Sequence, residues 1–139
     1  MLKKGKVLAL DYGTKRIGVA SGDFEMKVAF PRSIIENKSF DFVAENILKT
    51  CKELDVKLIL IGLPLSMQEG QVENPILKSI KWFANKLQPL IEEKGIELEF
   101  FDERLSSFEA ERVFEEFKMS GHDDAHAAQI ILQRYFDSV

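Results

Sequence analysis

Two apolar runs joined by one short turn constrain the fold of this chain more than any other feature. Residues 7–10 lead to a single carboxylate, Asp11, and a five-residue turn with Gly13 and two cations precedes the second run, residues 17–20. This pattern predicts an antiparallel β-hairpin. A carboxylate at the end of a buried strand, beside a glycine that lets backbone approach a ligand, fits two kinds of site. One is a loop that grips phosphate, and the other is an Asp that holds a metal.

The rest of the chain alternates helices with strands. The predicted elements after the hairpin are a strand over 27–36, a helix over 40–54, a strand over 56–61, a helix from Pro75 to about 90, a strand over 96–100, and helices over about 106–118 and 123–137. Pro31 marks an edge strand or a bulge because it lacks an N–H. Ser39 is the expected N-cap of the first helix. Strict alternation over 96–100 predicts a strand with one buried and one wet face.

The order βββαβαβαα predicts an α/β fold, a mixed five-stranded sheet with helices on both faces. Right-handed crossovers place the first strand centrally and give the strand order 3-2-1-4-5. Asp11 then lies at the carboxyl end of a central strand, the edge at which such sheets bind ligands. At 139 residues, the chain is expected to form a single domain, 1–139.

Composition indicates an ordinary globular protein, with 45% hydrophobic and 30% charged residues. The net charge of -4 argues weakly against a protein that coats nucleic acid, but residues 1–32 carry seven Lys/Arg against three acids. This basic segment on an acidic body is compatible with nucleic-acid binding at one edge. Cys51, the one cysteine, is expected to be a buried hydrophobe. Neither a signal peptide nor a membrane-length run is apparent, so the cytoplasm is the expected compartment.

Acidic residues follow two predicted strands and open the last predicted helix. They are Asp11, Glu103, and Asp123 or Asp124. If they converge, their mutual repulsion favours a bound cation, and Mg²⁺ suits carboxylate oxygens. Two such ions can activate water and stabilise the leaving oxygen of a phosphodiester. Simpler roles remain open: Glu103 can pair with Arg104, and an Asp at a helix start is favoured by the macrodipole.

Four segments resemble the YqgF/RuvX family of the RNase H-like superfamily, which is similar to RuvC-type Holliday junction resolvases. The segments are Leu-Asp-Tyr-Gly-Thr-Lys-Arg-Ile-Gly-Val-Ala (10–20), Ile-Gly-Leu-Pro-Leu-Ser-Met (61–67), Asp-Glu-Arg-Leu-Ser-Ser (102–107), and Asp124 with Ala127, Ala128 and Ile-Leu-Gln (131–133). The resemblance implies a metal-dependent nuclease that processes the precursor of 16S ribosomal RNA. Holliday junction resolution is the older proposal for the family.

The same resemblance implies the site residues and partners. Asp11, Glu103 and Asp124 would be the catalytic ligands of Mg²⁺ or Mn²⁺, and Lys15, Arg16 and Arg104 would hold phosphates. The implied partners are nucleic acid, either pre-rRNA or branched DNA, and ribosomal particles. No membrane is implied, and the chain is expected to be a monomer or a homodimer. His122 and His126 are further candidates as proton carriers or ligands.

One segment departs from the family pattern, and two other functions stay open. Members commonly carry several Lys/Arg before the last helix, whereas residues 115–123 hold one cation, Lys118. Fewer contacts to phosphates weaken the binding of nucleic acid, unless another surface of the protein contacts the phosphates instead. This departure favours a non-catalytic adaptor for nucleic acid or ribosomes. Asp-x-Gly-Thr also resembles the phosphate loop of actin-like ATPases, but these need a second related domain for which 139 residues leave no room.

Overall fold

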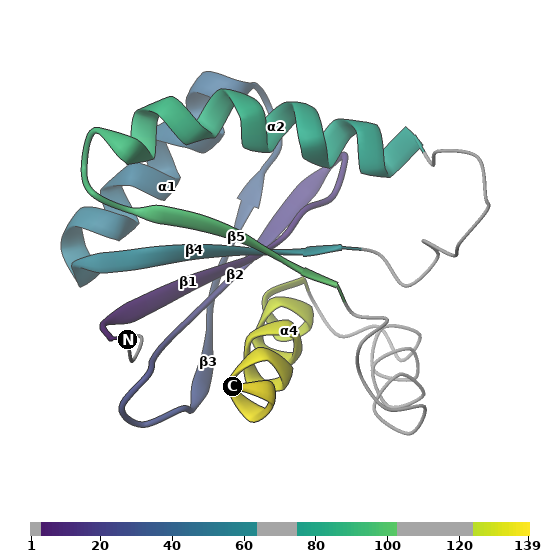
Figure 1. The fold of residues 1–139 in the computed structure, drawn as a ribbon. Coiled ribbons are helices and arrows are strands. Elements are labelled where there is room, and N and C mark those ends of the chain that lie inside the picture. Colours follow the sequence, from purple (N-terminus) through teal and green to yellow (C-terminus); the bar gives the residue numbers. More distant parts are fainter. Residues whose placement is uncertain (1–3, 64–74, 103–123) are drawn as a thin grey trace.

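One mixed sheet of five strands, in the order β3-β2-β1-β4-β5, forms the centre of the molecule (Figure 1). The computed structural model describes residues 4–63, 75–102 and 124–139. The elements are β1 (Lys6–Asp11), β2 (Arg16–Asp23), β3 (Ala29–Glu36), α1 (Phe40–Leu54), β4 (Val56–Leu63), α2 (Pro75–Glu92), β5 (Glu97–Asp102) and α4 (Asp124–Ser138). The predicted strand order is confirmed, and the predicted helix over 106–118 lies outside the described residues.

β1 lies at the centre of the sheet and pairs with strands of both orientations. It runs antiparallel to β2, with Asp11 opposite Gly18, and parallel to β4, with Leu10 opposite Ile61. β5 continues the parallel half, with Asp102 opposite Leu63. The carboxyl ends of β1, β4 and β5 therefore meet at one edge, which we call the carboxyl edge.

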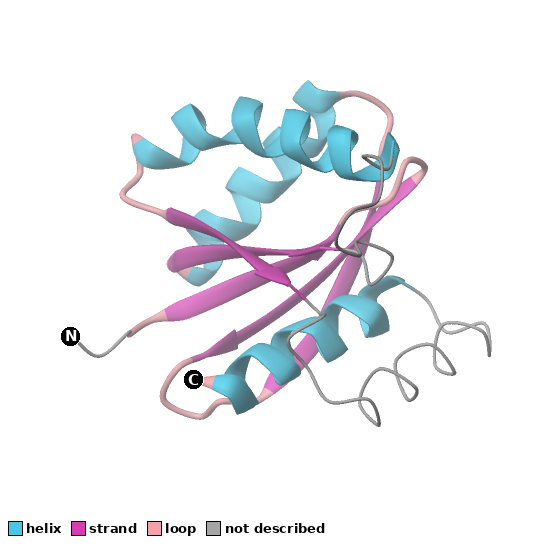
Figure 2. Cartoon of the chain, turned by 45° about the vertical axis from the view of Figure 1, so that its right-hand side comes forward, coloured by secondary structure: helices cyan, strands magenta, loops and turns pink. Residues whose placement is uncertain are grey.

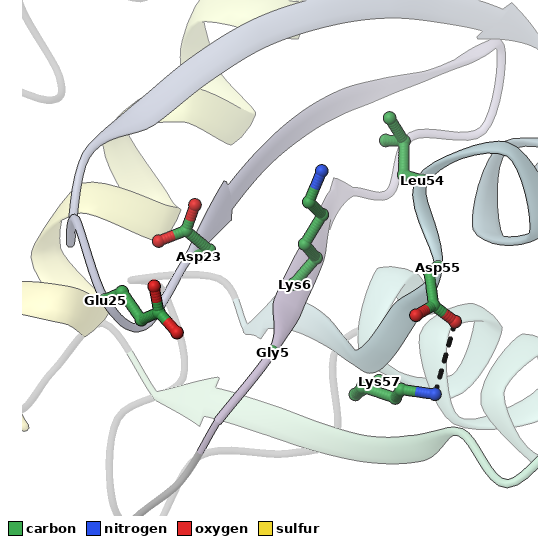
Figure 3. A pocket seen from close by; sticks show the side chains of 7 residues that line it. All are labelled: Gly5, Lys6, Asp23, Glu25, Leu54, Asp55 and Lys57. Carbon is green, nitrogen blue, oxygen red and sulfur yellow. Dashed lines mark ion pairs between the residues drawn. The ribbon is translucent and has the colours of Figure 1, made fainter.

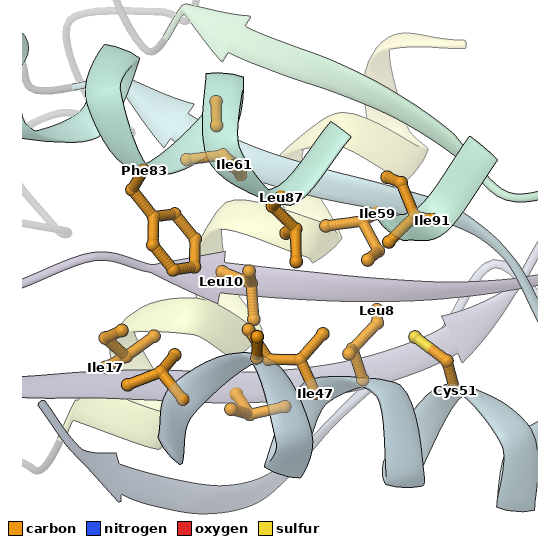
Figure 4. Packing of buried hydrophobic residues seen from close by; sticks show 14 of the residues in the cluster. Leu8, Leu10, Ile17, Ile47, Cys51, Ile59, Ile61, Phe83, Leu87 and Ile91 are labelled. Atoms are coloured by element: carbon orange, nitrogen blue, oxygen red, sulfur yellow. The ribbon is translucent and has the colours of Figure 1, made fainter. Parts of the chain in front are cut away.

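Helices cover both faces of the sheet, as predicted: α1 and α2 lie on one face and α4 lies on the other (Figures 1 and 2). Side chains alternate between the faces along each strand. In β1, Leu8 and Leu10 join the core under α1 and α2 (Figure 4), whereas Val7 and Ala9 join the core under α4. The sheet thus separates two apolar cores, and both depend on the same strands.

Local signals set the bounds of α1. The Ser39 hydroxyl accepts a hydrogen bond from the Phe42 N–H at 3.1 Å, so Ser39 is the N-cap that the sequence predicts. At the other end, Asp55 adopts the left-handed conformation and its N–H donates to the carbonyl of Cys51. The predicted helix over 40–54 is confirmed, and Cys51 is buried on its inner face.

Two glycines of the sheet let α4 approach it closely, because neither has a Cβ that would clash with the helix side chains. A Cβ at Gly62 would lie 2.7 Å from the Ile131 side chain, and one at Gly22 would lie 2.8 Å from the Phe136 ring. Gly62 lies near the end of β4, and Gly22 pairs with Val7 near the start of β1. α4 therefore runs antiparallel to β1, and its first turn points toward the carboxyl edge.

Polar side chains of α4 also bind the edge strand β3. Gln133 accepts a hydrogen bond from the Ala29 N–H at 3.0 Å and donates to the Lys27 carbonyl at 2.9 Å. Gln129 donates to the Ala29 carbonyl at 3.0 Å. β3 is an edge strand in which the register shifts opposite Pro31, as that proline predicts.

The prediction for the last strand is wrong in part. β5 spans Glu97–Asp102 and both of its faces are partly covered, because Phe101 packs against Tyr135 of α4 with ring centroids 5.8 Å apart. Phe100, expected inside, is 41% exposed. Glu99, expected to be wet, is half-buried and accepts a hydrogen bond from the Tyr135 hydroxyl at 3.0 Å.

Other element ends differ from prediction by one or two residues. β4 continues through Gly62 and Leu63 rather than ending at Ile61, because both residues still pair with β5. Among the described ranges, no helix is long and apolar enough to cross a membrane.

Candidate active site at the carboxyl edge

Asp11 is the last residue of β1 and is half-buried at the carboxyl edge. Parallel pairing brings the ends of β4 and β5 to the same edge, so Asp102, the last residue of β5, lies there as well. The ring of Tyr12, the next residue after Asp11, packs against Phe83 of α2 with centroids 5.0 Å apart. This contact anchors the chain directly after the carboxylate.

The turn that follows Asp11 is held in one shape by glycine and by Asn37. A Cβ at Gly13 would lie 2.5 Å from the Arg16 carbonyl oxygen, so only glycine fits. The Asn37 side-chain amide donates to the Gly13 carbonyl at 2.9 Å, and the Asn37 N–H donates to the Lys15 carbonyl, also at 2.9 Å. The connection from β3 to α1 therefore fixes the turn that carries the two predicted phosphate-binding cations.

Those cations line an open hollow of about 420 Å³ at this edge. Its lining residues are Lys15, Arg16, Glu36, Asn37 and Lys38. Lys38 and Glu36 form an ion pair with an N–O distance of 3.7 Å, and both side chains are largely exposed. Three cations against one carboxylate make the hollow suitable for an anion such as phosphate.

The structure brings only part of the predicted site together. Asp11, Lys15 and Arg16 lie at the carboxyl edge, and α4 begins at Asp124 with its first turn pointing toward that edge. His126 lies in that first turn and is half-buried. Glu103, Arg104 and His122 lie outside the described residues, as does the cation-poor segment 115–123. Sequence reasoning missed Asn37, for which an Asn directly after a predicted strand was the available signal.

Carboxylate oxygen is the donor that Mg²⁺ and Mn²⁺ prefer, and Asp11 presents it at the end of a strand. The described ranges alone do not complete a metal site, since they contain no group of three or more His, Cys, Asp or Glu side chains placed to hold one ion. The predicted donor set of Asp11, Glu103 and Asp124 fits a divalent cation in its chemistry. Its convergence remains a prediction.

A second hollow, of about 240 Å³, lies at the opposite edge of the sheet (Figure 3). It is lined by Gly5, Lys6, Asp23, Glu25, Leu54, Asp55 and Lys57. None of the predicted site residues is among them. Cations and carboxylates mix here, and Lys57 already pairs with Asp55 at 3.2 Å (Figure 3). Two lysines against three carboxylates leave this hollow slightly negative, so it does not suit a phosphate.

Cys51 is excluded as a nucleophile by its surroundings. It is 2% exposed, and burial raises the pKa of its thiol to about 11. The thiolate that would attack an electrophile is therefore disfavoured near neutral pH. The expectation that Cys51 acts as a small core residue is confirmed.

Comparison with known proteins agrees with the predicted resemblance. The family model described as "RuvX: Holliday junction resolvase" matches residues 5–138. A protein of Endomicrobium trichonymphae named "Putative pre-16S rRNA nuclease" is 36% identical over 138 residues, covering 95% of each chain. A protein of the same name from Anaeromyxobacter sp. (strain Fw109-5) is 34% identical over 137 residues, covering 95% of this chain and 96% of the relative.

Solved structures agree with the predicted fold. Thermus thermophilus RuvC superposes with a TM-score of 0.59 at 8% identity, covering 96% of this chain and 95% of RuvC. RuvC of T. thermophilus in complex with a Holliday junction substrate gives 0.62 at 11% identity, with 96% and 94% covered. At these identities the likeness concerns the fold, and the predicted RNase H-like architecture is confirmed.

Proposed function

The chain belongs to the RuvX family, and from this membership we propose that it is a metal-dependent endonuclease that matures the 5′ end of pre-16S rRNA. One observation carries the proposal from the family to this chain. The carboxylate of Asp11 lies at the end of the central strand, directly before a turn whose cations line an open, positively charged hollow. A nuclease needs this combination of a metal-binding carboxylate and a grip for phosphate.

Each proposed residue has a distinct task. Asp11, Glu103 and Asp124 would hold two Mg²⁺ or Mn²⁺ ions, whose chemistry is the activation of water and the stabilisation of a leaving oxygen. Lys15, Arg16 and Arg104 would position the phosphates on either side of the cleaved bond, the arginines through two parallel N–H donors. Asn37 would act as a positioning residue, because it holds the turn that carries Lys15 and Arg16.

Resolution of Holliday junctions is the second candidate function. The description of the family model and the fold shared with RuvC favour it. Both candidates use the same chemistry on a phosphodiester and differ in the shape of the nucleic acid.

We further propose that the protein acts in the cytoplasm. It would act as a monomer or a homodimer, on free RNA or on ribosomal particles.

A side-by-side cleavage assay tests the proposal. Purified protein and its Asp11→Asn variant are incubated with a pre-16S rRNA fragment and with a four-way DNA junction, each in Mg²⁺ or Mn²⁺. We expect wild-type protein to cut the RNA, and Asp11→Asn to reduce cutting to the level of the metal-free reaction, because the amide does not hold the cation. Circular dichroism checks that the variant is folded.

Asp55→Asn provides the matched control. Asp55 is an exposed aspartate at the opposite edge, in a left-handed conformation that Asn tolerates well. This variant should cut like wild type. Full cleavage by pure Asp11→Asn would overturn the site, and cleavage of the junction alone would select the second function. Metal binding without cleavage of either substrate would support the non-catalytic adaptor.

A further inference from the structure

An exposed tryptophan, packed on a partly buried phenylalanine, lies on the helical face of the molecule near the carboxyl edge. Trp82 of α2 is 53% exposed, and its ring packs edge-on against Phe40, the first residue of α1, with centroids 6.1 Å apart. The inner neighbour of Trp82, Phe83, is 2% exposed in the core. Trp82 therefore extends the apolar packing outward, and about half of its large ring is open to a ligand.

Ammonium groups lie beside the exposed ring of Trp82 and the partly buried rings of Phe40 and Phe42. The Lys86 nitrogen is 4.6 Å from the Phe40 centroid and 4.8 Å from the Trp82 centroid. The Lys38 nitrogen is 4.9 Å from the centroid of Phe42. Lys78, Trp82 and Lys86 are spaced four residues apart and so share one face of α2. Cations and aromatic rings thus alternate along this part of the surface.

The rings connect to the candidate active site through direct contacts. Tyr12, which follows Asp11, packs on Phe83 at 5.0 Å, and Phe83 packs on Phe40 at 5.9 Å. On the other side, Lys38 lines the basic hollow together with Lys15 and Arg16. Lys38 lies two residues before Phe40, so it links the hollow to the rings beside Lys86. We call Lys15, Arg16, Lys38, Phe40, Trp82 and Lys86 the aromatic-basic surface.

We infer that the aromatic-basic surface binds single-stranded nucleic acid, as the track for the strand that flanks the cleaved bond. The identity of that strand as substrate rests on the proposed function. An exposed ring such as that of Trp82 stacks on bases of any sequence, and the lysines beside it neutralise the phosphates that link the bases. The lysines of this track would provide the phosphate contacts for which segment 115–123 has only one cation.

The charges favour a nucleic acid over a second copy of the chain. The surface has four cations, and the carboxylates beside them among the described residues are three: Glu36, which is paired with Lys38, Asp41 in the first turn of α1, and Asp11 before the turn. The surface is therefore positive in a chain whose net charge is -4. Two copies meeting here would bring like charges together, whereas a polyphosphate complements them.

Binding to a fluorescein-labelled 12-nucleotide single-stranded RNA tests the inference without cleavage. The protein carries Asp11→Asn and the buffer contains EDTA, so the affinity does not depend on the proposed chemistry. We expect Trp82→Ala to weaken binding by about tenfold, within the range of one lost base stack. Lys86→Gln should reduce the slope of log K against log salt by about 0.7, as expected for one lost contact to a single strand.

Two further measurements sharpen the test. Trp82 is the one tryptophan of the chain, so base stacking should quench its intrinsic fluorescence when unlabelled RNA is added. Phe30→Ala is the matched control, because Phe30 of β3 is 51% exposed but lies in the edge strand rather than on the aromatic-basic surface. This variant should bind RNA like the parent protein.

The outcomes separate the inference from the proposed function. Unchanged affinity in both Trp82→Ala and Lys86→Gln, or unquenched tryptophan fluorescence at saturation, would overturn the inference. A change of sedimentation coefficient in Trp82→Ala without loss of RNA binding would assign the surface to self-association instead. If Trp82→Ala weakens binding while Asp11→Asn leaves cleavage intact, the track stands and the catalytic assignment fails.

Discussion

At the scale of single residues, Asn37 shows how much a site depends on bonds that are distant in the sequence. Its side-chain amide and its N–H both hold the turn between β1 and β2. Replacing Asn37 with Ala removes the bond to the Gly13 carbonyl and should lower the free energy of unfolding by about 1 kcal/mol. The turn then loses a restraint on Lys15 and Arg16. We therefore expect the rate of RNA cleavage to fall even under conditions in which the variant is fully folded.

Urea unfolding and the cleavage assay together check this prediction. Asn46→Ala is its control, because the Asn46 amide donates to the Phe42 carbonyl at 2.8 Å within α1, away from the turn. That variant removes the same kind of bond and should keep wild-type cleavage. Equal losses of activity in the two variants would show that Asn37 has no special role in positioning.

The position of Asp11 could be predicted from the sequence, but the role of Asn37 could not. Asp11 directly follows an apolar run, so its place at a strand end is a local property of the chain. The partner of Asn37 is a carbonyl 24 residues away, and the contact exists only once β3 pairs beside the hairpin. Glu103 and Asp124 as metal ligands remain predictions, since their meeting with Asp11 depends equally on tertiary structure.

At the scale of elements, the hydrogen bonds of Gln133 join α4 to the edge of the sheet. Gln133→Ala leaves the Ala29 N–H and the Lys27 carbonyl without these partners. We expect a loss of about 1–2 kcal/mol in the free energy of unfolding, because the bond from the Ala29 N–H is partly buried whereas the Lys27 carbonyl can bond to water instead. The Ala29 amide should also exchange with deuterium faster than in wild type, which mass spectrometry or NMR can measure.

Gln88→Ala serves as the comparison for Gln133→Ala. Gln88 bonds Glu92 on the exposed face of α2 at 3.2 Å, so its loss should change stability by no more than about 0.5 kcal/mol. If Gln133→Ala changed stability no more than Gln88→Ala, the bonds of Gln133 would not contribute to holding α4 on the sheet.

The elements differ in how far local sequence determines them. The bounds of α1 follow from a capping serine and an apolar stripe, which are both local, and the predicted range is met at both ends. β5 is different, because the burial of Phe101 depends on Tyr135, a residue 34 positions later. Alternation within the strand could not show that α4 would cover its second face.

At the scale of the whole molecule, the buried thiol of Cys51 couples stability to alkaline pH. Burial raises its pKa from 9.0 to about 11, so the unfolded chain loses this proton at lower pH than the folded chain does. The stabilisation is fully present below pH 9 and is lost as the pH rises toward 11. The expected loss is up to about 2–3 kcal/mol, at 1.36 kcal/mol for each unit of pKa.

Urea unfolding at pH 8 and at pH 10.5 measures this effect. Cys51→Ala lacks the thiol, so its stability should fall less between the two pH values than that of wild type. Every other ionisable group is the same in both proteins, so its contribution cancels in the difference. Identical pH dependence in the two proteins would show that the thiol ionises equally in both states.

The edge strand β3 has a consequence for how the protein behaves at high concentration. Exposed strand edges invite other chains to add to the sheet, and Phe30 and Ile34 of β3 present apolar side chains to solvent. Pro31 provides no N–H, and the register shift beside it breaks the regular spacing of donors and acceptors. We therefore expect β3 to be a poorer template for fibril growth than an unbroken edge strand with the same apolar side chains.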